Sequence, residues 1–339
     1  MTVFPWAAPM REFGRAGPDE FAEIRKSGQP AVFRGIAAEW PAVTASRQGD
    51  ETFVAYLKRF CTTRRVGAIM GPPEIGGRFF YNDDFTQMNF QRGATLFEPF
   101  LDRLLRDRGE AVVHAIAVQS ELVQEILPGF EIENRVEMLH RQVQPRAWIG
   151  NRIQVAPHYD LYENIGVVAA GRRRFTVFPP EQLPNLYAGP FELTPAGTPI
   201  SLVELANPDL ERFPKFRDAM AAAQCAVLEP GDAIYIPYYW WHAVDSLEAV
   251  NLFINYWWND APREGGRPYD ALVYGFFAFK TLPAEQRAVW RNIFDHYVFQ
   301  TNGDPGEHLP VQARGVLGAP TPALLDRIRR GIKKIADSL

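Results

Sequence analysis

Cysteine is scarce in this chain of 339 residues. The only two are Cys61 and Cys225, and neither lies in a Cys-x-x-Cys or similar metal-binding spacing. A cysteine-rich zinc module and a disulfide-stapled scaffold are therefore excluded. One disulfide is possible, but buried thiols are the better interpretation. We therefore expect a reducing, cytoplasmic location.

Long apolar runs and long basic runs are also absent. No stretch approaches the ~18 to 20 apolar residues of a membrane span. The first residues lack the basic start and long apolar core of a secretory signal. The formal net charge is -4, with no extended block of Lys and Arg. We therefore expect neither membrane insertion nor nucleic-acid binding.

What the chain does contain is the composition of a globular protein. Apolar residues make up 47%, charged residues 22% and aromatic residues 13%. This argues against global disorder. The length suffices for one elaborated domain or two ordinary ones. Aromatic rings in such number fill cores, but they also line pockets.

The local patterns divide the chain into three parts. Residues 1–145 read as mixed α/β, with a short apolar strand around 31–34 and helical periodicity near 18–26, 51–60 and 96–105. Residues 261–339 read as helical, with helices over about 283–298 and from Thr321 onwards. This C-terminal segment either packs on the core or forms a homodimer interface.

The middle part, residues 146–260, reads as short β segments separated by Pro and Gly turns. Many short strands of this kind favour a sandwich or barrel over a parallel sheet. The candidate strands are Ala147–Ala156, Glu163–Ala169, Arg173–Phe178, Ala226–Leu228, Ala233–Ile236 and Leu252–Trp257.

Three potential metal ligands stand out in this middle part. His158 and Asp160 are two residues apart, so on a strand they share a face. His242 follows Asp160 by 82 residues (242 − 160), and a double-sheet jelly roll brings such distant strands together. Two imidazoles and one carboxylate form the facial triad that holds Fe(II). The alternative is a chance His-x-Asp pattern and a surface histidine.

The sequence around these ligands resembles that of the cupin-like, Jumonji-type 2-oxoglutarate oxygenases. Within them it resembles the subgroup of the factor-inhibiting-HIF asparaginyl hydroxylase and its bacterial relatives. The resemblance is dense from about 148 to 258 and looser upstream. The matching stretches are Pro157-His158-Tyr159-Asp160 with Asn164, Phe178-Pro179-Pro180-Glu181-Gln182-Leu183, Asn207-Pro208-Asp209, Pro230-Gly231-Asp232, Trp240-Trp241-His242 and Val250–Trp257.

The resemblance implies a fold that is mainly β with flanking helices: a double-stranded β-helix (cupin jelly roll) core with helical N-terminal and C-terminal additions. It implies Fe(II) as cofactor and 2-oxoglutarate as cosubstrate. His158, Asp160 and His242 match its catalytic iron ligands. Asn164 and Asn255 match positions that line the cosubstrate pocket. Trp148, Tyr159, Tyr162, Trp240 and Trp257 are candidate pocket walls.

Two positions depart from the pattern. Arg173 stands where the asparaginyl hydroxylase has the lysine that binds the distal carboxylate of 2-oxoglutarate, and Val155 replaces a threonine that donates a hydrogen bond to it. Strand alternation places Arg173 on the same face as Phe175 and Val177, which look core-facing. A buried guanidinium needs an anion. That anion is either a bound dicarboxylate or an internal Asp or Glu.

The resemblance thus predicts a dioxygenase that hydroxylates a C–H bond of a protein side chain or of a small molecule. Two other classes stay open. One is a metal-retaining cupin that binds or senses a ligand without turnover, which Arg173 and Val155 favour slightly. The other is an interaction protein that uses the fold as a scaffold.

Overall fold

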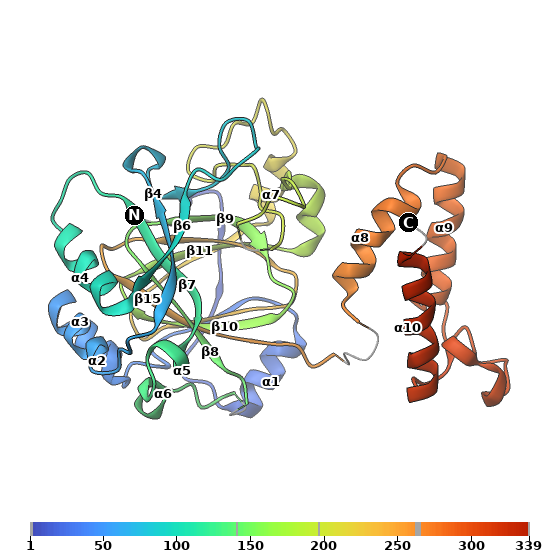
Figure 1. Ribbon diagram of the computed structural model, residues 1–339, viewed down its shortest axis with the longest axis horizontal. Helices are drawn as coiled ribbons and strands as arrows, with labels where there is room; N and C mark the ends of the chain where they lie inside the picture. Colours follow the sequence, from blue (N-terminus) through green and yellow to red (C-terminus); the bar gives the residue numbers. More distant parts are fainter. Residues whose placement is uncertain (1–2, 140–141, 196, 262–265, 338–339) are drawn as a thin grey trace. The chain divides into compact units, whose positions relative to one another are not determined.

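The computed structural model describes residues 3–139, 142–195, 197–261 and 266–337, so parts of the expected N-terminal and C-terminal segments lie outside the described residues. The chain forms two compact units, residues 1–259 and 260–339 (Figure 1). The candidate site lies entirely in the first unit.

The first unit is built on two sheets, each mixed in strand direction. The six-stranded sheet has the order β1 (Ala8–Pro9), β12 (Gln224–Leu228), β11 (Arg173–Phe178), β14 (Trp241–Ser246), β9 (Gln154–Tyr159) and β5 (Arg78–Phe79). The nine-stranded sheet has the order β2 (Arg11–Phe13), β3 (Ala31–Phe33), β13 (Ala233–Ile236), β10 (Glu163–Ala170), β15 (Asn251–Trp258), β8 (Pro145–Gly150), β7 (Ala115–Leu122), β4 (Arg65–Gly71) and β6 (Gln91–Leu96). The expected mainly β, cupin jelly-roll fold with flanking helices is confirmed.

Helices cover one face of the larger sheet (Figure 1). Strand β10 is therefore buried on both faces, with Val168 in the core between the sheets and Val167 in the core beneath the helices. Burial on both sides explains why Glu163–Ala170 reads as a nearly continuous apolar run. The helices are α1 (Pro18–Lys26), α2 (Pro41–Arg47), α3 (Asp50–Lys58), α4 (Phe97–Asp107), α5 (Val123–Ile126) and α6 (Phe130–Glu133).

A β-bulge shapes strand β9 next to the metal ligands. His242 on β14 lies opposite His158, whereas Val244 lies opposite Val155. The partner strand thus advances two residues while β9 advances three, so β9 carries one extra residue around Pro157. Pro is tolerated at such a position because no ladder hydrogen bond is lost. The bulge turns both Val155 and His158 towards the inside of the jelly roll.

Most of the strands expected in the middle part are present, with one error. The segment Ala147–Ala156 was expected as one strand, but it forms the end of β8 in one sheet and the start of β9 in the other. The chain crosses between the sheets at residues 151–153, and Asn151 bonds there to the Ile116 and His114 backbones. Strand β14, which carries His242, was not predicted.

The N-terminal part does not form a separate layer, because β2 to β7 extend the two jelly-roll sheets. The predicted helices near 18–26, 51–60 and 96–105 correspond to α1, α3 and α4. Both cysteines are free thiols, with Cys225 buried and Cys61 half-buried.

The second unit is helical, as the sequence predicts (Figure 1). It contains α8 (Pro268–Phe279), α9 (Ala284–Tyr297) and α10 (Pro322–Ala336). The Thr321 side chain caps α10 by accepting a hydrogen bond from the Leu324 N–H at 3.2 Å. Helix α8 was not predicted. None of the described helices is both long and apolar enough to cross a membrane.

Candidate metal centre

The structure brings His158, Asp160 and His242 together. One potential ligand atom from each lies within 4.8 Å of the others. The two imidazole rings are 4.3 Å apart between centroids, and His242 Nε2 lies 3.6 Å from Asp160 Oδ2. This proximity follows from the register, because β9 and β14 are adjacent and pair His158 directly with His242. The three donors contain no thiolate and suit Fe(II) or Mn(II).

Both imidazoles are oriented by their own strands. His158 Nδ1 lies 3.0 Å from the Ala156 carbonyl oxygen, and His242 Nδ1 lies 3.1 Å from the Trp240 carbonyl oxygen. A carbonyl only accepts, so each Nδ1 is the donor of this hydrogen bond and each Nε2 is left to face a metal ion. Burial, with His158 beside it, lowers the pKa of His242 to about 4. The ring is therefore neutral at pH 7, as a metal ligand must be.

Asp160 is held by donors from the nine-stranded sheet. Its Oδ2 accepts a hydrogen bond from Trp257 Nε1 at 3.1 Å and a longer one from Asn164 Nδ2 at 3.4 Å. Asn164 in turn accepts from Asn255 Nδ2 at 3.0 Å, and Asn255 accepts from Trp148 Nε1 at 2.7 Å. The two asparagines predicted to line the cosubstrate pocket do line the cavity, and they also connect a chain of hydrogen bonds that ends on Asp160.

A cavity of about 320 Å³ opens beside the three ligands. Aromatic and aliphatic side chains form much of its wall, including Phe175 and Phe253. Of the expected wall residues, Trp148 and Trp257 line it, whereas Tyr159, Tyr162 and Trp240 are not among its lining residues. Further lining residues were not expected from the sequence: Ile69, Phe79, Phe90, Arg92, Gln119, Ser120, Pro195 and Ile200.

Arg173 points into this cavity, on the face predicted from strand alternation. Its side chain is buried, and Nη2 donates to the Trp148 carbonyl at 3.0 Å, while Nε has no hydrogen-bond partner within the described part of the chain. The guanidinium carbon lies 5.1 Å from the centre of the Phe253 ring. Burial lowers the pKa of Arg173 to about 9. The group remains a cation at pH 7, and no carboxylate among the described residues pairs with it.

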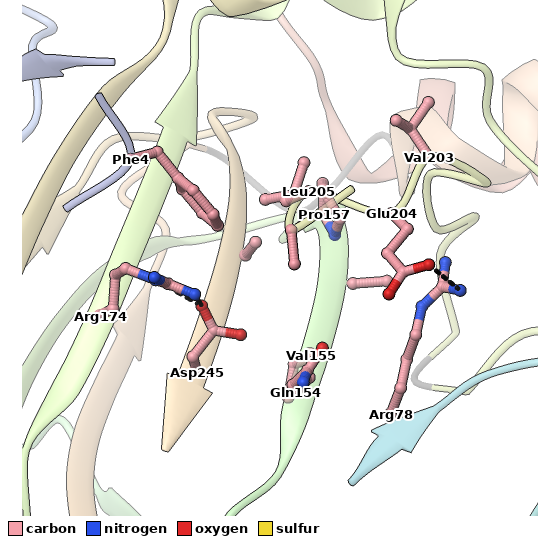
Figure 2. Close-up of a pocket in the computed structure, with 13 residues that line it drawn as sticks. Phe4, Arg78, Gln154, Val155, Pro157, Arg174, Val203, Glu204, Leu205 and Asp245 are labelled. Carbon is pink, nitrogen blue, oxygen red and sulfur yellow. Dashed lines mark hydrogen bonds and ion pairs between the residues drawn. The ribbon is translucent and has the colours of Figure 1, made fainter. Parts of the chain in front are cut away.

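The neighbouring Arg174 shows what a satisfied arginine looks like on the same strand. Its side chain lies on the opposite face of β11, where Nη2 reaches Asp245 Oδ2 at 2.7 Å (Figure 2). The guanidinium also lies over the Phe4 ring at 3.9 Å. Arg174 thus has an internal carboxylate, and no corresponding carboxylate lies beside Arg173 among the described residues. The internal salt bridge weighed for Arg173 from the sequence is absent from that part of the chain.

Comparison with known proteins agrees with this architecture. The cupin-like domain family matches residues 18–264, which include all strands of the two sheets except β1 and β2, and every residue that lines the cavity. The chain belongs to this family. The resemblance to Jumonji-type cupin proteins seen in the sequence is thereby confirmed at the level of the family.

Several curated proteins are similar to the chain. It is 40% identical to HSPB1-associated protein 1 of Bos taurus over 259 residues, which cover 68% of this chain and 48% of that protein. It is 28% identical to lysine-specific demethylase 8 of Danio rerio over 239 residues, with 68% and 53% covered. For lysine-specific demethylase JMJ30 of Arabidopsis thaliana the identity is 27% over 238 residues, with 69% and 50% covered. The chain matches about half the length of these relatives.

Proposed function

We propose that this protein is an Fe(II)- and 2-oxoglutarate-dependent oxygenase that hydroxylates a C–H bond. The observation that carries the proposal is the presence, in one cavity, of three convergent metal donors and of the buried cation Arg173, which has no carboxylate partner among the described residues. The donors suit iron. The cation suits the distal carboxylate of the cosubstrate.

Iron(II) bound by His158, Asp160 and His242 supplies the O2 chemistry that couples decarboxylation of 2-oxoglutarate to succinate with substrate oxidation. The chain contributes position and environment. The two Nε2 atoms and the Asp160 carboxylate would hold the ion. Arg173 would hold the far carboxylate of the cosubstrate. Phe175 and Phe253 would exclude water from the space between Arg173 and the metal ligands.

The named relatives include lysine-specific demethylases and HSPB1-associated protein 1, and these descriptions belong to those proteins. For this chain the proposal covers the reaction class, with a protein side chain or a small molecule as substrate.

A metal-retaining cupin without turnover is the second candidate, and Val155 favours it. Val155 lines the cavity and offers no hydroxyl to a bound dicarboxylate. In such a protein the cavity would hold a ligand beside a spectator metal. The two candidates differ in whether 2-oxoglutarate is consumed.

The deciding experiment measures succinate release and O2 consumption by the iron-loaded full chain with 2-oxoglutarate. We expect slow uncoupled turnover that disappears in His158→Ala and falls in Arg173→Met. Stabilisation of the protein by 2-oxoglutarate without succinate release would instead support the sensor. If 2-oxoglutarate neither stabilised the protein nor was converted to succinate, the oxygenase proposal would be overturned.

A further inference from the structure

Strand β6 forms an open sheet edge beside the mouth of the cavity. It is the last strand of the nine-stranded sheet and pairs only with β4 within the described part of the chain. Phe90, just before the strand, and Arg92, within it, line the cavity. We propose that this edge binds an extended acidic segment of a protein substrate as an added β-strand and presents one of its side chains to the metal centre. This inference rests on the proposed oxygenase function.

The backbone of β6 is oriented for such pairing. The Gly67 N–H on β4 donates to Glu121 Oε1 on β7 at 2.8 Å, so Gly67 faces β7 rather than β6. Its partner Ala94 is thus a non-hydrogen-bonded position of the β4–β6 pair, as is Arg92 two residues before it. The N–H and C=O groups of Arg92 and Ala94 therefore point away from β4. An extended peptide uses such groups in β-strand addition.

Apart from the charge of Arg92, the sequence of β6 does not protect this edge. The strand Gln91–Leu96 contains no proline, and five of its six residues are exposed. Edges of this kind are normally shortened, bulged or covered, because they otherwise recruit other strands. The Arg65 guanidinium donates to the Ala94 carbonyl, which retains a second lone pair for another donor. An exposed and regular edge beside a reactive cavity is consistent with a binding role.

Arginines on β6, β4 and β8 select the kind of peptide. Arg92 donates to the Pro195 carbonyl, Arg65 to the Ala94 carbonyl, and Arg146 Nη1 to the Ser120 carbonyl at 2.6 Å. Within the described residues these three cations thus bond to main-chain oxygens and not to carboxylates. Asp160, the acidic residue that lines the cavity, is a proposed metal ligand. A segment rich in Asp or Glu complements this surface, and a lysine-rich segment is repelled.

The size of the cavity agrees with a peptide that stays mostly outside it. About 320 Å³ is at the lower end of the roughly 300–1,000 Å³ typical of ligand pockets. Part of that space is needed for the cosubstrate beside Arg173. What is left accommodates one side chain, while the backbone of the substrate lies along β6.

The test uses fluorescence anisotropy with the Mn(II)-loaded full chain and 2-oxoglutarate. The probes are fluorescein-labelled peptides of about twelve residues in which Thr alternates with Glu, Gln or Lys. We expect the Glu peptide to bind about tenfold or more tightly than the other two, with an affinity that falls as salt is added. Equal binding of the three peptides, or preference for the Lys peptide, would overturn the proposal.

Two variants separate backbone pairing from charge. Ala94→Pro removes one outward N–H without touching the bonds to β4, which a solvent-facing edge position tolerates. We expect it to weaken binding of the Glu peptide about tenfold, whereas Ala94→Val keeps the N–H and the affinity. Arg92→Glu is expected to reverse the preference between the Glu and Lys peptides.

The matched control is Arg11→Glu on β2, at the opposite edge of the same sheet. Arg11 lies over the Phe13 ring at 5.2 Å, much as Arg92 lies over the Phe90 ring at 5.3 Å. Arg11→Glu is expected to leave the affinity for all three peptides unchanged. If the Glu peptide bound both Ala94→Pro and Arg92→Glu as tightly as it binds the wild type, the site would be refuted. Two variants are used so that poor folding of one does not prevent the test.

The assays for peptide binding and for turnover test the two proposals separately. Succinate release without peptide tests the oxygenase proposal, and its increase by a pool of Glu-rich peptides randomised at the central position tests the substrate class. Uncoupled turnover without peptide binding or stimulation would overturn the inference and leave the oxygenase intact. Binding at β6 without any turnover would overturn the oxygenase proposal and leave β6 as a peptide-binding edge only.

Discussion

At the scale of single residues, two adjacent arginines on β11 have opposite environments. Arg174 meets Asp245, whereas Arg173 is buried beside Phe253 with its Nε unsatisfied in the described structure. A buried charge without a partner destabilises a fold. Its presence makes sense if a bound anion compensates it, and the metal donors across the cavity suggest which anion.

Replacing Arg173 therefore has opposite consequences for the free and the bound protein. We expect Arg173→Met to raise the unfolding free energy of the ligand-free protein by about 1–4 kcal/mol, because an apolar side chain replaces an uncompensated charge. The same variant should lose the rise in Tm that 2-oxoglutarate produces in the metal-loaded wild type. Differential scanning fluorimetry measures both.

The control for that experiment is Arg173→Lys, which keeps the positive charge and should keep part of the shift in Tm. If 2-oxoglutarate stabilised Arg173→Met as much as the wild type, Arg173 would not be the cosubstrate anchor.

Asp160 depends on a donor that belongs to another strand. Trp257 Nε1 on β15 donates to its Oδ2. Trp257→Phe keeps a ring but removes this bond, and we expect metal affinity to fall about 10- to 100-fold. The affinity for 2-oxoglutarate at saturating metal should change much less. Titration of Mn(II) followed by electron paramagnetic resonance checks the first expectation, and calorimetry the second.

Trp258→Phe is the matched control, because Trp258 packs instead against Phe21 and Tyr235. A similar loss of metal affinity in both variants would mean that general loosening of β15, and not the bond to Asp160, explains the effect.

At the scale of elements, the close packing of β10 and β15 shapes the cavity wall. Gly166 on β10 has no side chain, and a Cβ atom there would lie 1.9 Å from Phe253 Cζ. The Phe253 ring occupies this space while it lines the cavity beneath Arg173. The glycine thus leaves room for the Phe253 ring against the neighbouring strand.

We expect Gly166→Ala to lower the unfolding free energy by about 1–3 kcal/mol, because Phe253 must leave its position in a packed core. The double variant Gly166→Ala with Phe253→Leu should recover part of that loss. Urea denaturation followed by circular dichroism measures both. Gly14→Ala is the control, since nothing lies within 4 Å of its added Cβ; an equal loss there would contradict the packing argument.

At the scale of the whole molecule, the C-terminal unit presents apolar side chains on its surface. Ile328 and Ile332, one turn apart on α10, are 37% and 59% exposed. An apolar stripe of this kind on a helix is normally covered by another part of the protein or by a partner. Of the two alternatives, packing on the core or joining two copies of the chain, we propose the second for these helices.

This proposal predicts a homodimer of the full chain by size-exclusion chromatography with light scattering. Ile332→Glu should shift the mass to that of a monomer, because a carboxylate would be buried in the interface. Arg329→Glu on the same helix is the control and should leave the dimer intact. A monomeric wild type would rule the interface out.

Much of the site was predictable because its signals are local. His158 and Asp160 share a face through spacing alone, and alternation with Phe175 correctly turned Arg173 inward. Helices α1, α3, α4, α9 and α10 were predictable from their apolar periodicity. Helix α8 was missed, since it is apolar on most sides and its periodicity is weak.

The parts that the sequence missed depend on long-range pairing. Arg92 and Ser120 reach the cavity because β6 and β7 extend a sheet whose centre lies more than a hundred residues later in the chain. The bulge in β9 is visible only against β14, because a bulge is a mismatch between two strands. The link from Asn255 through Asn164 to Asp160 likewise requires three segments to be side by side.

The sequence by itself determined the fold class through its resemblance to a known family. It also determined the three potential metal ligands and the inward direction of Arg173, since these follow from residue type and spacing within one or two segments. Only the tertiary structure decided that Arg173 lacks a carboxylate within the described residues, that Asp160 is held by Trp257, and that an open strand edge borders the cavity. Charge compensation, hydrogen bonding and sheet order are relations between distant segments, and folding establishes them.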